Sequence, residues 1–344
     1  MSVTISNVKK QEIKRAKFDK NNDLVNGPIM SSCTIDITRK LDKEYDETYL
    51  CIFTNLLRQI SLEYVPTYAY TKDSISISLN NSRFDNDVMR EHLSQLPITK
   101  INHDVFYLDK KYWKTSINDD IINHKDDTYE IESYVNINNT NKYILNVTTD
   151  HLSTFVNKKE VKNMYEEYDP IVLIKLKPNE TFQCNMRGIL GVPKKCENWC
   201  AASTIFYKYD DESNIVRLKL SSHGQFDEIN ILFRACEFIK MKSKTLHNYI
   251  DDLKNEMNLS TNDEIIFELS FKDDNYTVTY FLNYILQNMK EIKYAGIYKK
   301  SYLENDIYIK IISNSHDPFI PIHNAIDIMY NIYDDFQKKL NKFK

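Results

Sequence analysis

Near the start of the chain, the spacing of apolar residues changes from every second position to every third or fourth. In residues 33–38 (CTIDIT), apolar and polar residues alternate, which predicts a half-buried strand. In residues 46–63, apolar residues recur at spacings of three and four, which is typical of one face of an amphipathic helix. This helix is expected to end just before Pro66. Its inward residues are Leu50, Phe53, Leu57 and Ile60.

Residues 66–210 have a different pattern, made of short stretches of alternating residues between Asn- and Asp-rich connections. Such a pattern predicts a β-rich insert. A short helix is expected at residues 87–96, because Pro97 would stop it there. Strands are expected at residues 74–79, 131–135, 143–147 and 170–176.

A long helix is predicted after the insert. It follows a strand at residues 215–220 and a break at Gly224, and Asp227 and Glu228 lie at its start, where the helix dipole favours carboxylates. Its apolar residues form a long, narrow stripe with one gap at Ser243, and such a stripe needs a partner helix. The stripe consists of Ile229, Leu232, Cys236, Ile239, Leu246, Ile250, Leu253 and Met257.

The end of the chain repeats the order of strand, helix, strand and long helix. Strands are expected at residues 265–271, 292–297 and 307–312, with a helix at residues 276–289. A final helix is expected after Pro321. Its apolar stripe consists of Ile322, Ile326, Met329, Tyr333, Phe336 and Leu340.

The repeated order predicts an α+β fold with two copies of one dimerisation unit, paired through their long helices as an intramolecular pseudo-dimer. The first copy comprises residues 29–65 and 211–258, and the insert of residues 66–210 interrupts it. The second copy comprises residues 259–344, and residues 1–28 are an N-terminal arm ending in an Asn-Gly-Pro turn. The predicted dimerisation seam contains Leu232, Ile239, Leu246, Ile250, Leu253, Phe281, Ile285, Ile326, Met329, Tyr333 and Phe336.

The composition is that of a globular chain, with 42% hydrophobic residues, 27% charged residues and a formal net charge of −4. This mild acidity argues against a protein whose whole surface binds nucleic acid. The chain has only five glycines, against a usual share of about 7%, and none has the spacing of a phosphate-binding loop. No apolar segment is long enough for a secretory core or a membrane span. We therefore expect a chain that is cytosolic, nuclear or packaged in a particle.

Candidate metal ligands are few. We expect the six cysteines to be reduced thiols, because they are too sparse for a disulfide framework in a chain of this length. Cys196 and Cys200, with Cys184 nearby, could supply three ligands of a structural zinc, with His151 or His223 as the fourth. The alternative is that these three cysteines are buried or partly exposed thiols.

No arrangement of residues predicts catalysis in this chain. The histidines form no H-E-x-x-H motif and have no obvious nucleophile beside them. The basic run at residues 9–20 is either a solvated tail or a contact for nucleic acid or an acidic partner. We therefore expect no catalytic, cofactor-binding or metal-binding residues.

Several segments resemble the alpha-type assembly subunits of cellular RNA polymerases. Asn55-Leu56-Leu57-Arg58, followed by Val65-Pro66, resembles the N-A-L-R-R…V/M-P helix of that family. Residues 81–98 are similar to its N-T-S-V…D-E-F-I-A-H-R-L-G-L-I-P-L segment. Residues 170–178 and 188–199 resemble its P-I-L-I-x-K-L-R-P-G-Q…G-I-G-K-x-H-A-K-W segment. Residues 222–225 (SHGQ) lie where the family has an E-S-x-G turn before its long helix.

The last third resembles the smaller partner of that subunit. Residues 274–282 (DNYTVTYFL) are similar to E-D-H-T-L-G-N-L-L, and residues 292–296 (IKYAG) are similar to V-x-F-A-G. In eukaryotic polymerases these patterns lie on the third-largest and the eleventh subunits, whereas some large DNA viruses encode a fused arrangement. The chain departs from the family pattern at Gln59, at Glu91-His92 and at Thr279-Tyr280.

The resemblance implies a non-catalytic scaffold that holds the two large catalytic subunits. It implies partners among the largest, second-largest and small polymerase subunits, only indirect contact with DNA or RNA, and no homo-oligomer. The catalytic Mg would lie in the largest subunit. The stretch after Pro97 has no cysteine, so the family's zinc-binding cysteine loop is missing or replaced. The implied interface with the second-largest subunit contains Asn55, Leu56, Arg58, Gln59 and Leu62.

The expected location is the cytoplasm of an infected cell or the virion if the chain is viral, and the nucleus if it is cellular. Two other functions remain open at this point. One is a free-standing nucleic-acid-binding module that uses the basic N-terminal arm. The other is an enzyme of unrecognised class.

Overall fold

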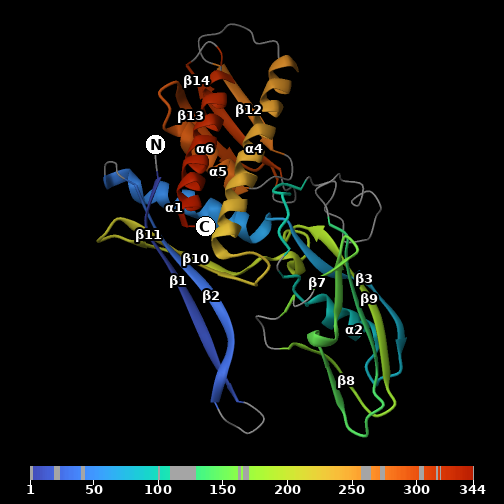
Figure 1. The fold of residues 1–344 in the computed structure, drawn as a ribbon. Coiled ribbons are helices and arrows are strands. Elements are labelled where there is room, and N and C mark those ends of the chain that lie inside the picture. The colour runs from blue at the N-terminus through green and yellow to red at the C-terminus, as the bar shows by residue number, and fades with distance from the viewer. Residues whose placement is uncertain are drawn as a thin grey trace.

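The structure, a computed structural model, describes residues 3–18, 24–39, 43–99, 101–108, 129–161, 164–165, 170–256, 265–271, 276–301, 306–314, 317 and 319–343. These residues form a mixed α+β fold with antiparallel sheets, as the order of elements predicts (Figure 1). The predictions at Met257, at the boundary after residue 258 and at the first residues of the segment 274–282 lie outside the described residues.

The first α/β unit has a four-stranded sheet, and helices α1 (Lys43–Glu63) and α4 (Glu228–Glu256) lie against it. Both helices share one hydrophobic core with the sheet, because their apolar faces match the inward side chains of the strands. The strand order is β1 (Val3–Phe18), β2 (Leu24–Arg39), β11 (Ile215–Ser222) and β10 (Ala202–Asp210), and all neighbours are antiparallel.

The second α/β unit has a three-stranded antiparallel sheet, with helices α5 (Tyr276–Gln287) and α6 (Phe319–Leu340). Its strand order is β12 (Ile265–Phe271), β14 (Ile307–Ser313) and β13 (Ile292–Tyr298). Strands β2, β11 and β10 of the first unit have the same order: the first strand in sequence lies at one side, the third in the centre and the second at the other side. In both units a helix follows the first strand and another follows the third.

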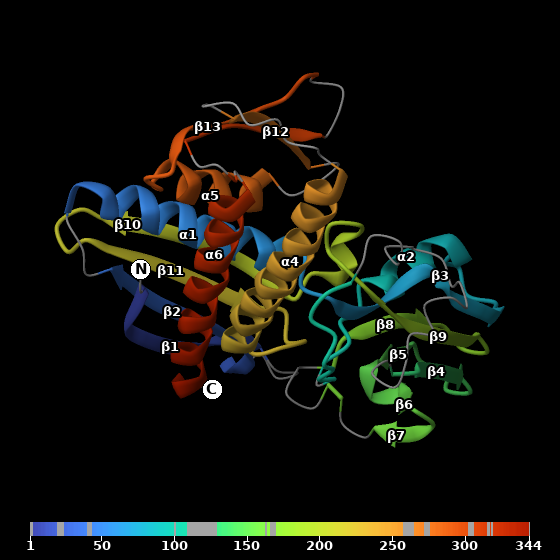
Figure 2. The ribbon, with the colours of Figure 1, turned by 90° about the horizontal axis from the view of Figure 1, so that it is seen from above.

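The insert lies beside the two α/β units (Figure 2) and has its own hydrophobic core. Helix α2 (Asn86–Ser94) packs on strand β3, and short 3-10 turns occur at Thr149–His151, Glu197–Trp199 and, at the end of the chain, Asn341–Phe343. The main sheet has the order β3 (Thr67–Asn80), β9 (Thr181–Gly191), β4 (Ile131–Asn138), β6 (Ser153–Val156) and β7 (Lys159–Val161). Strands β5 (Leu145–Thr148) and β8 (Val172–Leu176) form a separate pair.

Helices α4 and α6 lie side by side and run in opposite directions (Figure 2). Their direction follows from their contacts: Lys240 meets Asp334, His247 meets His323, and Lys254 meets Asp317, so residue numbers rise on α4 as they fall on α6. The buried apolar residues of both units belong to one continuous hydrophobic core. The two units are therefore joined by packed side chains and not only by the connecting chain.

The prediction for the N-terminal arm was wrong in one respect. Residues 3–18 are not a separate arm but strand β1, which pairs antiparallel with β2 from Val3↔Arg39 to Phe18↔Leu24. The Asn26-Gly27-Pro28 segment lies inside β2 and does not form the expected turn. β2 pairs with β11 only from Ser32 to Thr38, so the rest of the hairpin extends away from the body as a two-stranded ribbon (Figure 1).

The predicted end of the insert at residue 210 also differs from the sheet pairing. Strand β10 pairs with β11 and not with any strand of the insert, because residues 202–210 and 215–222 form a hairpin. At other points the differences are small: β5 begins at Leu145, and α6 begins at Phe319, two residues before Pro321. Among the described residues, no helix combines the length and the apolar character needed to cross a membrane.

Candidate assembly surfaces

Most of the predicted seam residues belong to the hydrophobic core that the two α/β units share. Leu253 is half-buried, and the other ten are buried within the core that both units share. These ten are Leu232, Ile239, Leu246, Ile250, Phe281, Ile285, Ile326, Met329, Tyr333 and Phe336. The gap at Ser243 is also buried, and its hydroxyl donates to the Ile239 carbonyl at 2.9 Å, so the polar residue is satisfied within its own helix.

Tyr333 connects α6 to both α1 and α5. Its ring stacks on Phe53 with centroids 4.8 Å apart and meets Phe281 edge to face at 5.8 Å. Its hydroxyl donates to the Phe53 carbonyl at 3.1 Å, and complete burial raises the pKa of the phenol well above its ordinary value. Tyr49, which the apolar spacing did not single out, packs against Phe281 from α1 with centroids 6.0 Å apart. The seam therefore contains three helices around one aromatic cluster.

A polar cluster lies in the middle of the α4–α6 contact. The Lys240 ammonium reaches Glu237 at 3.0 Å, Asp334 at 3.1 Å and Gln337 at 2.6 Å. Burial alone would lower the pKa of Lys240, but its hydrogen bonds to Glu237 and Asp334 outweigh burial and raise it. Nothing in the local sequence distinguishes Lys240 from a surface lysine, so this cluster could not be found from spacing.

The predicted interface on α1 divides between surface and core. Asn55, Arg58, Gln59 and Leu62 are half-buried, whereas Leu56 is fully buried in the core and is not available at the surface. Leu56 points inward because it lies on the apolar face of α1, three residues after Phe53 and four before Ile60.

Polar contacts hold the rest of this α1 surface in place. Arg58 donates to the Asn55 side-chain oxygen, at 2.9 Å from one terminal nitrogen and 3.2 Å from Nε. Gln59 accepts a hydrogen bond from Thr277 of α5 and donates to Glu63 at 3.3 Å. Gln59 therefore connects α1 to the second unit as well as lying at the predicted interface.

The loop at residues 192–200 joins the end of α1 to the insert. The backbone N–H of Lys194 donates to the Glu63 carbonyl at 2.8 Å, and the Lys194 ammonium reaches the Glu63 carboxylate at 3.0 Å. Trp199 is completely buried and donates from Nε1 to the Ile189 carbonyl at 2.8 Å. A side chain at Gly191 would collide with the Trp199 ring, since an added Cβ would lie 2.3 Å from it.

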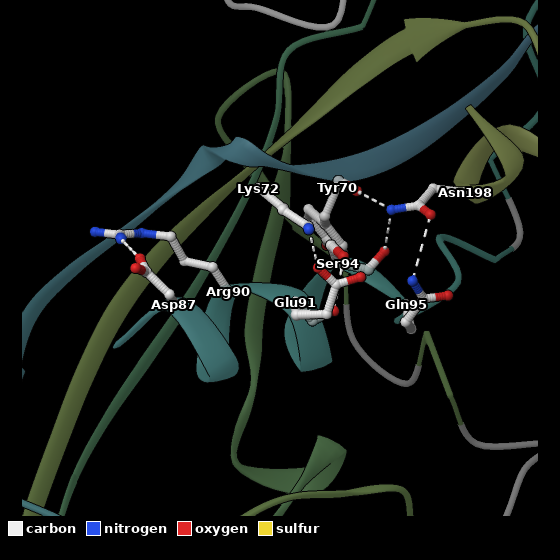
Figure 3. A network of polar contacts seen from close by, with 8 residues as sticks. All are labelled: Tyr70, Lys72, Asp87, Arg90, Glu91, Ser94, Gln95 and Asn198. Atoms are coloured by element: carbon white, nitrogen blue, oxygen red, sulfur yellow. Dashed lines mark hydrogen bonds and ion pairs between the residues drawn. The ribbon is translucent and has the colours of Figure 1, made fainter. Parts of the chain in front are cut away.

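Figure 3 shows how this loop contacts helix α2 and strand β3. The Asn198 amide donates to the Tyr70 carbonyl at 3.3 Å and to the Ser94 carbonyl at 3.1 Å, and Gln95 donates to its oxygen at 3.4 Å. Lys72 pairs with Glu91 across β3 and α2. Two of the segments that carry the family resemblance, residues 81–98 and 188–199, therefore lie together although about a hundred residues separate them.

Among the described residues, the structure does not group Cys184, Cys196 and Cys200 with His151 or His223, the zinc set that the sequence left open as one alternative. All six cysteines are free thiols. Burial raises the pKa of Cys184 to about 12, and the Cys200 thiol donates to the Ala202 carbonyl at 3.0 Å. His151 has a different role, because its Nδ1 accepts from the Thr148 backbone N–H at 3.2 Å. In the part of the chain that the structure describes, no three His, Cys, Asp or Glu side chains are grouped to hold a metal ion.

No protein-family model matches this chain, and no curated protein matches it.

Proposed function

We propose that the chain is a non-catalytic assembly subunit of a multisubunit DNA-directed RNA polymerase. In this role its two α/β units form an intramolecular pseudo-dimer, on which the two large catalytic subunits assemble. The proposal rests on the sequence resemblance given above and on the arrangement of the two units.

The observation that carries the proposal is the equal strand order of the two sheets, combined with the antiparallel contact of α4 and α6. In an isologous dimer, two equivalent units meet through antiparallel copies of the same element. The two units of this chain have the same strand and helix order and meet through their last long helices in this way. Such a dimer has one continuous interface, which agrees with the single core that spans both units.

Contacts from the second halves of α4 and α6 support the same arrangement. The Lys339 ammonium near the end of α6 donates to the Val3 carbonyl of the first sheet. The Tyr249 hydroxyl on the second half of α4 donates to the Ser270 carbonyl of the second sheet at 2.7 Å. Each long helix thus contacts an edge strand of the other unit's sheet, β1 for α6 and β12 for α4, which supports the pairing of the two units.

The scaffold role also needs a surface for a large partner. Arg58 is bonded to Asn55 on α1, the Cys200 thiol donates to the Leu62 carbonyl at 3.7 Å, and Asn198 of the same loop donates to Ser94 of α2. We assign the surface formed by α1, the loop at residues 192–200 and helix α2 to the second-largest subunit. Obligate interfaces of this kind are large, and single changes at their centre are costly.

The test is to purify the tagged chain with its partners and to identify them by mass spectrometry. The wild type should bring down two much larger chains. Ile250→Asp places a charge at a seam position that is 1% exposed, so the two units should separate and the large chains should be lost. Met241→Asp is the matched control, because Met241 lies on the same helix but is 37% exposed, and it should leave assembly intact.

A second pair of variants tests the partner surface without touching the core. Arg58→Glu should weaken recovery of the second-largest subunit, while Lys142→Glu, at an exposed position of the insert, should not. Recovery of a complete enzyme complex with Ile250→Asp, or equal recovery with Arg58→Glu and Lys142→Glu, would contradict the scaffold proposal.

One observation favours a second candidate function, which is contact with nucleic acid through the β1–β2 hairpin. The hairpin continues past Ser32, the last residue of β2 that pairs with β11, and β1 carries an excess of basic residues. Deleting residues 1–25 would remove a strand of the first sheet, so charge substitution is the better test. Replacing the exposed Lys9 and Lys10 by Gln should lower DNA affinity and its salt dependence, and unchanged binding would contradict this function.

A further inference from the structure

Two histidines face each other across the α4–α6 contact. The Nδ1 atoms of His247 on α4 and His323 on α6 are 2.7 Å apart. The other ring nitrogen of His247 is 3.1 Å from the Asp327 carboxylate, and that of His323 is 3.2 Å from Asp251. Each histidine is thus held by a carboxylate from the opposite helix, and both side chains are about three-quarters buried, with exposed fractions of 26% and 24%.

The two imidazoles lie head-on in one plane. Their planes differ by only 4°, and their centres are 5.0 Å apart. That separation equals the 2.7 Å gap plus the distance from each ring centre to its own Nδ1, so both nitrogens lie on the line that joins the centres. Both ring planes contain the line through the two Nδ1 atoms, and the planes are parallel, so the rings are coplanar. The outward direction at each Nδ1 therefore points at the other Nδ1.

The contacts fix how many protons the pair holds. An ionised carboxylate can only accept, so each Nε2 must carry a proton to donate to its aspartate. A hydrogen bond between the two Nδ1 atoms needs one further proton, which one ring donates and the other accepts. The two rings therefore hold three protons together and carry one positive charge between them.

We propose that the His247–His323 pair is a proton-dependent clamp that fixes the register of α4 against α6. With three protons, the shared proton joins the helices. A fourth proton would set two N–H groups against each other at 2.7 Å, and loss of the third would set two lone pairs against each other. Either change pushes the rings apart, so the clamp is complete only while the pair holds three protons. Histidine side chains in general change charge between about pH 5 and pH 8, which sets the range over which the clamp is tested.

The charged side chains around the pair include more carboxylates than lysines. Asp251 and Asp327 accept from the two rings, and Asp317, at the start of α6, interacts with His323. Asp317 is itself paired with Lys254 of α4 at 2.7 Å, and the exposed Lys244 lies one turn before His247 on the same helix. Three carboxylates against two lysines leave a net negative surrounding for the single positive charge of the pair.

A bound metal ion does not fit the geometry. A zinc ion would need to lie about 2.0–2.1 Å from each nitrogen. With the nitrogens 2.7 Å apart, no such point lies on the lone-pair direction of both rings. A proton is the ligand that fits between them.

The proposal does not depend on the polymerase role, and it is tested on the full chain alone. Urea unfolding midpoints are measured near pH 5, 6.5 and 8, in the presence of EDTA, for His247→Gln, His323→Gln and the double variant. Near pH 6.5 each single substitution should lower the urea midpoint. The double variant should have a midpoint close to that of either single variant, because each single substitution already removes the shared proton. At the two outer values the single changes should have a much smaller effect. His92→Gln, which removes an exposed imidazole on α2, should show no such pH window.

Nitrogen-15 NMR of the histidine rings gives an independent measurement. At the middle pH, one ring proton should couple to the Nδ1 atoms of both His247 and His323, and both Nε2 atoms should carry protons. Single-variant effects that are equal at all three pH values, or that simply add in the double variant, would overturn the clamp. Zinc-dependent stabilisation of the wild type that the double variant lacks would overturn it in favour of a metal site.

Discussion

His103 is a buried imidazole in the segment of the insert that docks on α4, and replacing it should remove a large part of the chain's sensitivity to acid. Its ring meets Tyr68 at 5.3 Å and Phe226 at 5.5 Å, both edge to face. Arg234 of α4 donates to the His103 carbonyl. Burial, together with the nearby Arg234 guanidinium, lowers the pKa of His103 to about 3.

The size of the effect follows from linkage. In the unfolded chain an imidazole has a pKa of about 6.5, so between pH 6.5 and the folded value of about 3 the unfolded state binds more protons. Stability is therefore complete above about pH 6.5 and falls as the pH drops below it, by about 2 kcal/mol at pH 5. Because domains are stable by only about 5–15 kcal/mol in total, this loss is large enough to measure.

The assay is urea unfolding of the wild type and of His103→Asn between pH 7.5 and pH 5. Asparagine keeps an acceptor for the Val105 N–H, which donates to the His103 Nδ1 at 3.3 Å, but it does not titrate. Over this pH range the free energy of unfolding of the wild type should fall by about 2 kcal/mol more than that of the variant. The comparison uses the change in the free energy of unfolding with pH. The constant cost of the smaller side chain and the contribution of other titrating groups therefore cancel between the two proteins. If the free energies of unfolding of the wild type and the variant fell in parallel with pH, the reasoning would be refuted, because His103 would then not be held neutral in the folded chain.

Three further predictions concern the seam and the joint with the insert. Tyr333→Phe should cost about 0.5–1.5 kcal/mol, since it removes one buried hydrogen bond, whereas Tyr333→Ala should cost about 3–5 kcal/mol in the same denaturation assay. Gly191→Ala should destabilise the chain by about 1–3 kcal/mol and shift tryptophan fluorescence, because its Cβ would meet the Trp199 ring. Hydrogen bonds from two lysines lower the pKa of Asp334, so its contribution is present above about pH 4 and is lost as the pH falls further. Asp334→Asn should therefore be less stable than the wild type at neutral pH and approach its stability in acid. A difference in stability that does not change with pH would contradict this.

The apolar spacing was sufficient to predict the helices and most strands of the two α/β units. Helices α1, α4 and α6 have long apolar stripes that only a helix places on one face, and each was predicted within a few residues of its observed ends. The burial of most predicted seam residues was predictable for the same reason, since an apolar stripe must be covered. Whether the seam serves polymerase assembly remains a prediction.

Sheet membership could not be predicted from spacing. Residues 202–210 form a strand, but their local sequence does not say which strand they pair with, and they join β11 rather than the insert. β1 was missed as a sheet strand because its partner lies across a hairpin and its many basic residues resemble a solvated tail. Leu56 was assigned to a surface because the family motif contains it, whereas its position on the apolar face of α1 places it in the core.

The polar residues of the seam explain why α4 and α6 adopt one register among several that their apolar stripes would allow. Lys240, His247 and Lys254 recur every seven residues on α4, so a slip of one heptad would keep the apolar stripes in contact. Their partners are unlike one another, however. Lys240 meets a carboxylate and an amide of α6, His247 meets an imidazole of α6, and Lys254 meets the carboxylate of Asp317, just before α6. A slip would set Lys240 near an imidazole and break the only head-on imidazole pair among the described residues. Apolar burial therefore brings the helices together. The unlike polar contacts select the alignment in which the apolar residues of both units pack into one core.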